Sequence, residues 1–323
     1  MEQKFPHFKD NMSPTSKVGG FVSEKFSKVK HTTSMLSLSN TYNIGDIKDF
    51  NNRIQKILNT STPLEYVLEL KLDGISISLI YEKGILKKAV TRGDGVYGED
   101  VTQNVMQIEN VPLKLSEDID IEVRGEIILP ISNFNKINEI REINGEAVFA
   151  NPRNAASGTL RQKDPKVVRD RNLSAIMYQI VNPTKYNINT EEEVLKYLVK
   201  LGFRVPYHFY AKFGTYGKFV NDNTVVKDSK EFPCDGLVFK LNNFSDQFRL
   251  GVTNKAPRYA VAYKFPPKEV KTKLNNVSWQ LGRTGKLTPV AEFEPIIIDG
   301  TVVSRATLNN YKYLINSKLR IND

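Results

Sequence analysis

The sequence predicts an α+β fold of antiparallel β-sheets with flanking helices, followed by a second, small β-rich domain. Three observations predict it. Between residues 64 and 129, runs of β-forming residues follow one another, and some alternate with the period of two that is typical of strands. Stretches with helical spacing stand on both sides of this region. A Pro266-Pro267 pair stops the pattern, and shorter β-like runs follow it.

The first half of the chain supplies one helix and most of the strands. Residues 1–43 are polar and turn-rich, so we expect an extended lead-in. Residues 44–58 predict an amphipathic helix that packs on a core through Ile47, Phe50, Ile54, Ile57 and Leu58. Strands are expected over residues 66–70, 75–81, 85–91 and 119–129. The Glu82-Lys83-Gly84 turn predicts that the second and third of these form an antiparallel hairpin.

Two further helices complete the first domain, which we expect over residues 44–267. One follows Pro130 and turns Ile131, Phe134 and Ile137 inward. The other spans residues 190–201, with a capping box of Thr190 and Glu193 and a terminal Gly202. Its predicted buried side consists of Leu195, Leu198, Val199 and Leu201. Strands over 237–241 and 259–265 end this domain.

Residues 268–323 predict the opening of a small β-barrel. Short strands are expected over 274–281, 287–293 and 296–304, separated by turns that contain Gly or Pro. An OB-fold is one candidate for such a barrel. The sequence ends at Asp323 after too few strands to close it, so we expect a partial barrel.

Charge and composition narrow the class of protein. The net charge of +10 favours an acidic partner, most often nucleic acid, although a merely lysine-rich protein from an AT-rich genome fits as well. A single cysteine, Cys234, excludes an intrachain disulfide and a Cys-rich zinc site. The histidines, His7, His31 and His208, are too widely spread for a His-based metal site. No apolar run approaches the ~18 residues of a membrane span, and no signal peptide is present. We therefore expect a soluble, cytoplasmic protein with no membrane partner.

The segment Glu69-Leu70-Lys71-Leu72-Asp73-Gly74 carries the first chemical signal. Lys-x-Asp-Gly between two strands is the pattern of covalent nucleotidyltransferases, whose lysine attacks a nucleotide α-phosphate; a surface lysine before an Asp-Gly turn is the alternative. Keeping a free lysine neutral at pH 7 costs about 4.6 kcal/mol unless neighbours depress its pKa, and nearby cations do this. Lys240 and Lys264 end two apolar runs, so each either projects into a shared cleft or is solvated.

Three other stretches suit phosphate and sugar chemistry. In Thr91-Arg92-Gly93-Asp94-Gly95, Arg92 reaches a ribose or phosphate oxygen, unless the stretch is an ordinary hairpin turn. Residues 122–126 place Glu122, Arg124 and Glu126 on one face of a strand, which is costly unless they line a cleft or an exposed edge. Glu126 is the natural acceptor for a ribose hydroxyl. Residues 149–161 combine small side chains with Arg153 and Arg161, which suits close approach to a phosphate backbone.

In this order and combination, these motifs resemble the NAD-dependent DNA ligases in their adenylation (nucleotidyltransferase) domain. The resemblance also covers residues from about Phe5 through 13–15 and 35–38, and on through 282–285 and 306–310, and thus nearly the whole chain. The Thr91–Gly95 and 151–156 stretches are specific to this family, whereas Lys-x-Asp-Gly is shared with ATP-dependent ligases and capping enzymes. The resemblance implies a nucleotidyltransferase fold, ATP-grasp-like, followed by a partial OB-fold.

The resemblance also implies roles for individual residues. Lys71 is the nucleophile that becomes adenylated, and Asp73 orients it. Glu69 reads the adenine amino group and Tyr178 stacks on the base. Arg92, Glu126 and Arg161 belong to the nucleotide cleft, while Arg153, Arg161 and Arg283 serve DNA. Lys240 and Lys264 neutralise the α-phosphate, and Asp235 is the carboxylate tentatively implicated with Mg²⁺.

The implied activity has three steps: adenylation of the lysine by NAD⁺, transfer of AMP to the 5′-phosphate of a DNA nick, and attack by the 3′-hydroxyl, as in DNA replication and repair. Nicked duplex DNA is the implied partner of a monomer. The family's N-terminal nicotinamide-mononucleotide-binding domain, the rest of the OB barrel, the four-Cys zinc finger, the helix-hairpin-helix region and the BRCT domain find no counterpart, so we expect the chain as given to react poorly with NAD⁺. A non-catalytic nucleic-acid-binding remnant and an ATP-dependent ligase or capping-type enzyme are the alternatives.

Overall fold

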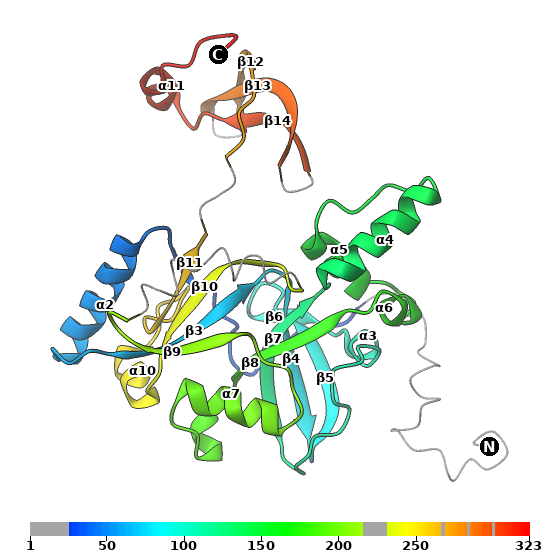
Figure 1. Cartoon of the computed structure of the whole chain (residues 1–323), viewed down its shortest axis with the longest axis vertical. Helices are drawn as coiled ribbons and strands as arrows, with labels where there is room; N and C mark the ends of the chain where they lie inside the picture. Colours follow the sequence, from blue (N-terminus) through cyan, green and yellow to red (C-terminus); the bar gives the residue numbers. More distant parts are fainter. Residues whose placement is uncertain (1–25, 216–230, 266–268, 283–284, 299–300) are drawn as a thin grey trace. The chain divides into compact units, whose positions relative to one another are not determined.

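A computed structural model describes residues 26–215, 231–265, 269–282, 285–298 and 301–323 of the chain. The chain divides into two compact units (Figure 1). The larger comprises Met1–Val148 and Pro152–Phe265, and the smaller Phe149–Asn151 and Pro266–Asp323. Pro266 and Pro267, the predicted boundary, lie outside the described residues, as does Arg283.

Two sheets form the body of the larger unit (Figure 1). The five-stranded sheet has the order β2-β11-β10-β3-β9, and the four-stranded sheet the order β5-β4-β7-β8. All pairs within them are antiparallel except β2 with β11, so the predicted α+β class with antiparallel sheets is confirmed. A separate pair joins β1 and β6. The strands are β1 (Lys28–Lys30), β2 (Ser39–Thr41), β3 (Glu65–Leu72), β4 (Ile75–Glu82), β5 (Ile85–Thr91), β6 (Tyr97–Glu99), β7 (Ile121–Ile128), β8 (Ser174–Ile180), β9 (His208–Lys212), β10 (Cys234–Leu241) and β11 (Ala260–Lys264).

Helices flank these sheets. They are α2 (Ile44–Leu58), α3 (Thr102–Val105), α4 (Ile131–Ile143), α5 (Pro152–Leu160), α6 (Lys166–Asp170), α7 (Glu191–Lys200) and α10 (Phe244–Leu250), with a 3₁₀ turn, η2, at Pro183–Tyr186. The bounds predicted for α2 are confirmed: the Asn43 side chain accepts a hydrogen bond from the backbone N–H of Asp46, and Asn59 ends the helix in the left-handed conformation. No helix in the described part is both long and apolar enough to cross a bilayer.

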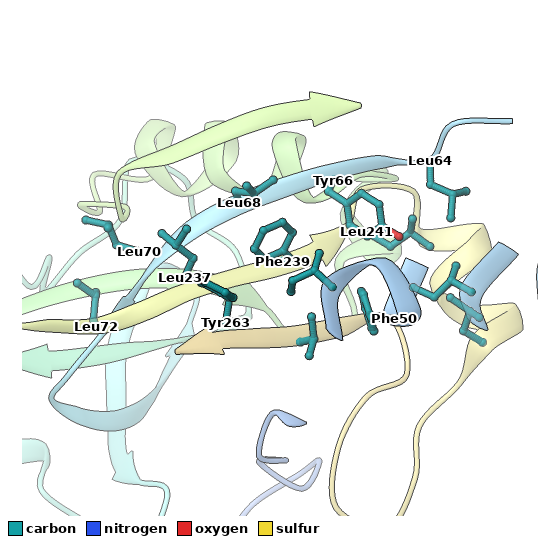
Figure 2. Close-up of a cluster of buried hydrophobic side chains, with 14 of the residues drawn as sticks. Phe50, Leu64, Tyr66, Leu68, Leu70, Leu72, Leu237, Phe239, Leu241 and Tyr263 are labelled. Carbon is teal, nitrogen blue, oxygen red and sulfur yellow. The ribbon is translucent and has the colours of Figure 1, made fainter. Parts of the chain in front are cut away.

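The main core lies between α2 and the five-stranded sheet (Figure 2). Tyr66, Leu68 and Phe239 are fully buried there, and Ile47, Phe50 and Ile54 approach from the helix. Ile57, which we expected to face this core, is 50% exposed. The buried stripe of α2 runs from Ile54 to Leu58 instead.

The observed burial corrects the buried faces that we predicted for α4 and α7. Helix α4 has no fully buried residue, and Ile131, Phe134 and Ile137 are only half-buried. On α7, Val194 is buried where we expected Val199, which is 56% exposed. The capping bond from Thr190 to the backbone N–H of Glu193 is confirmed, but the Glu193 carboxylate accepts from the N–H of Asn189 instead of Thr190. The hairpin between β4 and β5 is confirmed, with Lys83 and Gly84 both at positive φ.

The smaller unit is an antiparallel sheet of β12 (Leu274–Leu281), β13 (Leu287–Ile298) and β14 (Thr301–Thr307), followed by α11 (Tyr311–Ser317). Leu274, Ala291 and Leu308 form its small core. The strand predicted over 296–304 is wrong, because residues 296–298 prolong β13 and residues from 301 onward begin β14. A register shift between Glu292 and Ile296 lets β13 continue past Pro295.

Candidate active site

The predicted lysines lie on one face of the five-stranded sheet. Side chains alternate along a strand, so Leu68, Leu70 and Leu72 enter the core and Glu69 and Lys71 point the other way. Lys71 on β3 and Lys264 on β11 both lie opposite Gly236 of β10, between them. The sheet therefore brings two lysines, distant in sequence, to one place.

Asp235 lies between these two lysines. Its Oδ1 is 2.7 Å from Lys71 Nζ, and its Oδ2 is 3.8 Å from Lys264 Nζ. A register shift between Cys234 and Gly236 interrupts β10 at this point. The side chains of Lys71 and Asp235 are 22% and 34% exposed, so solvent reaches the group. We call Lys71, Asp235 and Lys264 the open end of the site.

The Lys-x-Asp-Gly motif continues into the crossing from β3 to β4. Asp73 Oδ1 accepts a hydrogen bond of 2.6 Å from Arg153 Nη1 on α5. A Cβ at Gly74 would lie 2.3 Å from the carbonyl oxygen of Ile127, so only glycine lets the chain pass β7 so closely. The close passage of β7 therefore requires glycine at position 74, and an ion pair with Arg153 holds Asp73 in place.

A second charged group lies deeper on the same sheet face. Lys240 Nζ is 2.8 Å from Glu69 Oε1 and 3.8 Å from Glu191 Oε2, and it donates to the carbonyl oxygen of Tyr178 at 3.1 Å. Gln247 Nε2 donates to Glu191 Oε1 at 2.9 Å. Glu69 is 2% exposed and Glu191 7%. We call Glu69, Lys240 and Glu191 the buried end.

Burial and charge act against each other at the buried end. Burial raises the pKa of Glu69, and the Lys240 ammonium only partly offsets it. Burial by itself lowers the pKa of Lys240, but Glu69 and Glu191 raise it above its ordinary value. The Lys240 ammonium lies 2.8 Å from Glu69 Oε1, and no other donor among the described residues reaches this buried oxygen. Beyond this ion pair, the carboxylate oxygen can accept a further hydrogen bond from a ligand.

The facing strands β4, β7 and β8 supply a third group. Glu126 Oε2 accepts from the hydroxyl of Ser76 at 3.0 Å and of Tyr178 at 3.3 Å. Burial raises the pKa of Glu126 to about 7, against those hydrogen bonds and the positive charge of Arg153. Burial and the nearby Glu126 also hold the pKa of Tyr178 well above its ordinary value. The Tyr178 ring lies beneath Lys240, whose Nζ is 5.1 Å from the ring centroid.

Glu122 and Arg124 share the face of Glu126, as their alternation predicts, but they pair with each other. Arg124 Nη2 lies 2.8 Å from Glu122 Oε1, and Arg124 is 4% exposed. The alternative of an exposed edge strand is wrong, because β7 lies between β4 and β8. Burial alone raises the pKa of Glu122, but hydrogen bonds from Thr32 and Ser78 and the charge of Arg124 lower it overall.

An arginine-lined cleft opens beside Gly74. It has a volume of about 190 Å³ and is bordered by Arg92, Arg153 and Arg161. Residues 152–160 form helix α5, whose Ala155 and Ala156 are fully buried, so small side chains let this helix sit close to the sheet. Arg161 Nε donates to Glu99 Oε2 at 2.8 Å. These three arginines make the cleft suitable for phosphate groups.

The structure separates two residues that we expected to act on one phosphate. Lys264 lies at the open end beside Lys71, whereas Lys240 ends in the buried pair with Glu69. Along β10 the positions opposite Lys264 and at Lys240 are four residues apart, or roughly 13 Å of strand. Glu191 and Gln247 were not predicted from the sequence. A glutamate in the first turn of a helix normally interacts favourably with the helix dipole, so Glu191 gave no signal of a role in the site.

Metal ligands do not gather at this site. Within the described ranges, no group of three or more His, Cys, Asp or Glu side chains could hold a metal ion. Asp235, the expected magnesium carboxylate, has two ammonium groups as neighbours. The donor set does not fit a metal held by protein groups alone.

Comparison with known proteins places this site in a family. Residues 23–268 match the family model described as the NAD-dependent DNA ligase adenylation domain. The chain belongs to the NAD-dependent DNA ligase family. Residues 271–323 match the OB-fold domain of the same ligases. The nucleotidyltransferase-type and OB-fold assignments are thereby confirmed.

Relatives named DNA ligase match the whole chain. The protein of Fervidobacterium nodosum is 45% identical over 325 residues, and that of Thermosipho africanus is 46% identical over the same length. The chain covers 47% and 49% of these proteins, so it spans about half the length of the relatives. A solved structure named Pmar-Lig_PreS3 is similar, with a TM-score of 0.47 and 13% identity, over 89% of this chain and 61% of that one.

Proposed function

We propose that this chain carries the adenylate-transfer and nick-sealing chemistry of an NAD-dependent DNA ligase. The Lys71 amine attacks the α-phosphorus of NAD⁺, and the bond to nicotinamide mononucleotide breaks. The AMP then passes to the 5′-phosphate of a nick in duplex DNA, and the 3′-hydroxyl displaces it to form the phosphodiester. The observation that carries the proposal is the placement of Lys71 beside Asp235 and Lys264, while Asp73, two residues from Lys71, pairs with Arg153 of the arginine-lined cleft.

At the open end, the proposed roles follow from charge and distance. Asp235 Oδ1 lies 2.7 Å from Lys71 Nζ, within the range for proton transfer from the amine before attack. Lys264 supplies a positive charge beside the same carboxylate, where a phosphate would arrive. Asp73 is held by Arg153 two residues from Lys71, and we propose that it orients the lysine.

At the buried end, the proposed ligand is the adenine base. Glu69 Oε1 suits the adenine amino group, and Lys240 beside it is a donor for the adjacent ring nitrogen. Guanine presents the reverse order of acceptor and donor, so the pair would reject it. We therefore propose that Lys240 serves the base instead of the α-phosphate. Glu126 would accept from a ribose hydroxyl, and Tyr178 would lie against the base.

Magnesium enters the proposal only together with the substrate phosphates. Mg²⁺ at phosphoryl-transfer sites commonly uses one or two carboxylates and the phosphates themselves. Asp235 is the carboxylate that would take part, and the ion would offset phosphate charge. Arg153 and Arg161 are proposed to contact the phosphate at the nick, so binding of nicked DNA should weaken steeply with salt.

Two reactions of the chain test the proposal. The first uses a nicked duplex that already carries the 5′-adenylate. The chain should seal it, and Lys71→Ala should seal it as well, because that step does not use the lysine nucleophile. The second uses labelled NAD⁺, ATP and GTP. We expect slow covalent labelling from NAD⁺ only, lost in Lys71→Ala and retained in Lys88→Ala, an exposed lysine on β5 that serves as the control.

Each reaction can contradict the proposal. Label that persists in Lys71→Ala would show that another residue is the nucleophile. Labelling from ATP would favour the ATP-dependent alternative. A folded chain that binds nicked DNA but seals no adenylated nick would favour the non-catalytic remnant.

A further inference from the structure

One stretch near the start of the described residues joins the two sheets of the larger unit. We call residues 31–41 the bridging segment. Its first part lies against strands and loops of the four-stranded sheet, and its last residues form β2 of the five-stranded sheet. The segment therefore spans the space between the sheet that carries Lys71 and the sheet that carries Glu126.

Arg124 and Glu122 anchor the first part of the bridging segment. The Arg124 guanidinium donates to the backbone carbonyls of Thr33 and Ser34, and its Nε donates to Glu122 Oε1 at 3.0 Å. Glu122 accepts from the Thr32 hydroxyl through its other oxygen. A buried guanidinium is costly unless its donors are used. Here they are used on the backbone of the bridging segment.

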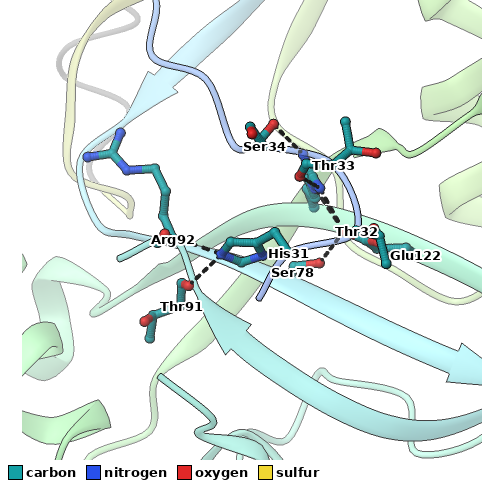
Figure 3. Close-up of polar contacts among 9 residues, drawn as sticks. His31, Thr32, Thr33, Ser34, Ser78, Thr91, Arg92 and Glu122 are labelled. Carbon is teal, nitrogen blue, oxygen red and sulfur yellow. Dashed lines mark hydrogen bonds and ion pairs between the residues drawn. The ribbon is translucent and has the colours of Figure 1, made fainter. Parts of the chain in front are cut away.

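The bridging segment in turn holds the loop that carries Arg92. His31 Nε2 lies 3.1 Å from the carbonyl oxygen of Thr91 and 3.2 Å from that of Arg92, to which it donates (Figure 3). The backbone N–H of His31 donates to the carbonyl of Val96, and that of Met35 to the carbonyl of Gly95. The loop is thus tied to the segment on both sides of Gly93, whose φ is +57°.

The other end of the segment is tied to the sheet with the lysines. The N–H of Ser37 donates to the carbonyl of Lys255, and the Thr41 hydroxyl donates to the carbonyl of Ala262. Residues 39–41 pair in parallel with residues 261–263 of β11, the strand that ends in Lys264. One continuous stretch therefore connects the backbone at Arg92 to the strand of Lys264.

We propose that His31 and Arg124 are positioning residues, which hold the bridging segment so that Arg92 is presented to phosphate in the arginine-lined cleft. The inference rests on the proposed function and adds to it a contact between Arg92 and a DNA phosphate, beside those proposed for Arg153 and Arg161. Neither residue borders the cleft itself, and both act through backbone carbonyls of the residues they contact.

The dependence of DNA binding on salt distinguishes positioning from simple stabilisation. Binding of a nicked duplex to the full chain is measured over a series of salt concentrations. Each phosphate contact contributes about −0.9 to the slope of log affinity against log salt, so Arg92→Gln should make the slope less steep by about 1. His31→Leu should do the same, and His31→Gln, which keeps a donor near the Nε2 position, should restore the original slope.

Three further variants complete the test. Arg124→Met should also lose about 1 from the slope, and the double variant Arg92→Gln/His31→Leu should lose no more than either single change. Thr33→Ala is the matched control: the Thr33 side chain is exposed and only its carbonyl meets Arg124, so its slope should stay that of the unmodified chain. If Arg124→Met does not fold, the half-buried His31 carries the test.

The inference is overturned if His31→Leu lowers the melting temperature but keeps the original slope, or if its effect adds to that of Arg92→Gln. An unchanged slope in Arg92→Gln would overturn it as well, because the phosphate contact would be absent. None of these outcomes concerns the sealing of a pre-adenylated nick by the unmodified chain, so failure here is distinguishable from failure of the proposed function.

Discussion

The open end and the buried end of the site lie at the same face of the five-stranded sheet and each pairs lysine with carboxylate side chains, yet they differ in exposure. At the open end, Lys71 and Asp235 are 22% and 34% exposed; at the buried end, Lys240 and Glu69 are 12% and 2% exposed. Charged side chains near solvent can exchange ion-pair partners at little cost in free energy. Buried charges depend on the partners that the fold places beside them. The open end therefore suits groups whose bonds change during a reaction. The buried end suits groups that bind a ligand without reacting with it.

Removing one lysine from each end is the most direct test of the difference between them. Lys240→Met leaves the buried Glu69 and Glu191 without their cation and should lower the free energy of unfolding by about 3–5 kcal/mol. Lys264→Met, at the 37% exposed partner of Asp235, should cost no more than about 1 kcal/mol. Denaturant titrations of both variants compare the two ends directly. Equal losses would show that burial does not separate them.

The pH dependence of stability tests the effect of burial at a third carboxylate, Glu126, which lies on the four-stranded sheet. Its pKa is raised from 4.5 to about 7 in the folded chain, so the folded state keeps a proton that the unfolded state has released. The contribution of Glu126 is therefore fully present below pH 4.5, is lost as the pH rises to about 7, and is constant above.

The expected loss over that window is about 3 kcal/mol. Glu126→Gln cannot titrate, so its free energy of unfolding should fall less between pH 4.5 and 7 than that of the unmodified chain. Denaturant titrations at four pH values measure the difference, and other titrating groups cancel in it. Parallel curves for the two proteins would show that folding does not raise the pKa of Glu126.

The smallest stability effect is expected at Asp235. Asp235→Asn removes a carboxylate whose partners are both reached by solvent, so the free energy of unfolding should change by no more than about 1 kcal/mol. Labelling of Lys71 by NAD⁺ should nevertheless slow by about 10²-fold, because the proposed proton acceptor is gone. A large stability loss with unchanged labelling would reverse the roles assigned to this residue.

Much of the site could be predicted from the sequence because its motifs have local physical reasons. Gly74 is needed where β3 crosses to β4, Lys71 stands in a strand, and the alternation in β7 correctly predicts that Glu122, Arg124 and Glu126 share a face. The helix α2 and the β4–β5 hairpin follow from periodicity and turn residues in the same way. Each of these features depends on residues within a few positions of one another.

The pairing of the charged side chains could not be read from local sequence. From the sequence, Lys240 and Lys264 were equivalent strand-end lysines, and no role was predicted for Glu191. Register across β3, β10 and β11 separates the two lysines and brings Glu191 to Lys240. The motifs and the strands that carry them could be predicted from the sequence, because spacing and alternation are local properties. The partners of each charge follow from strand register and burial, which depend on the whole fold.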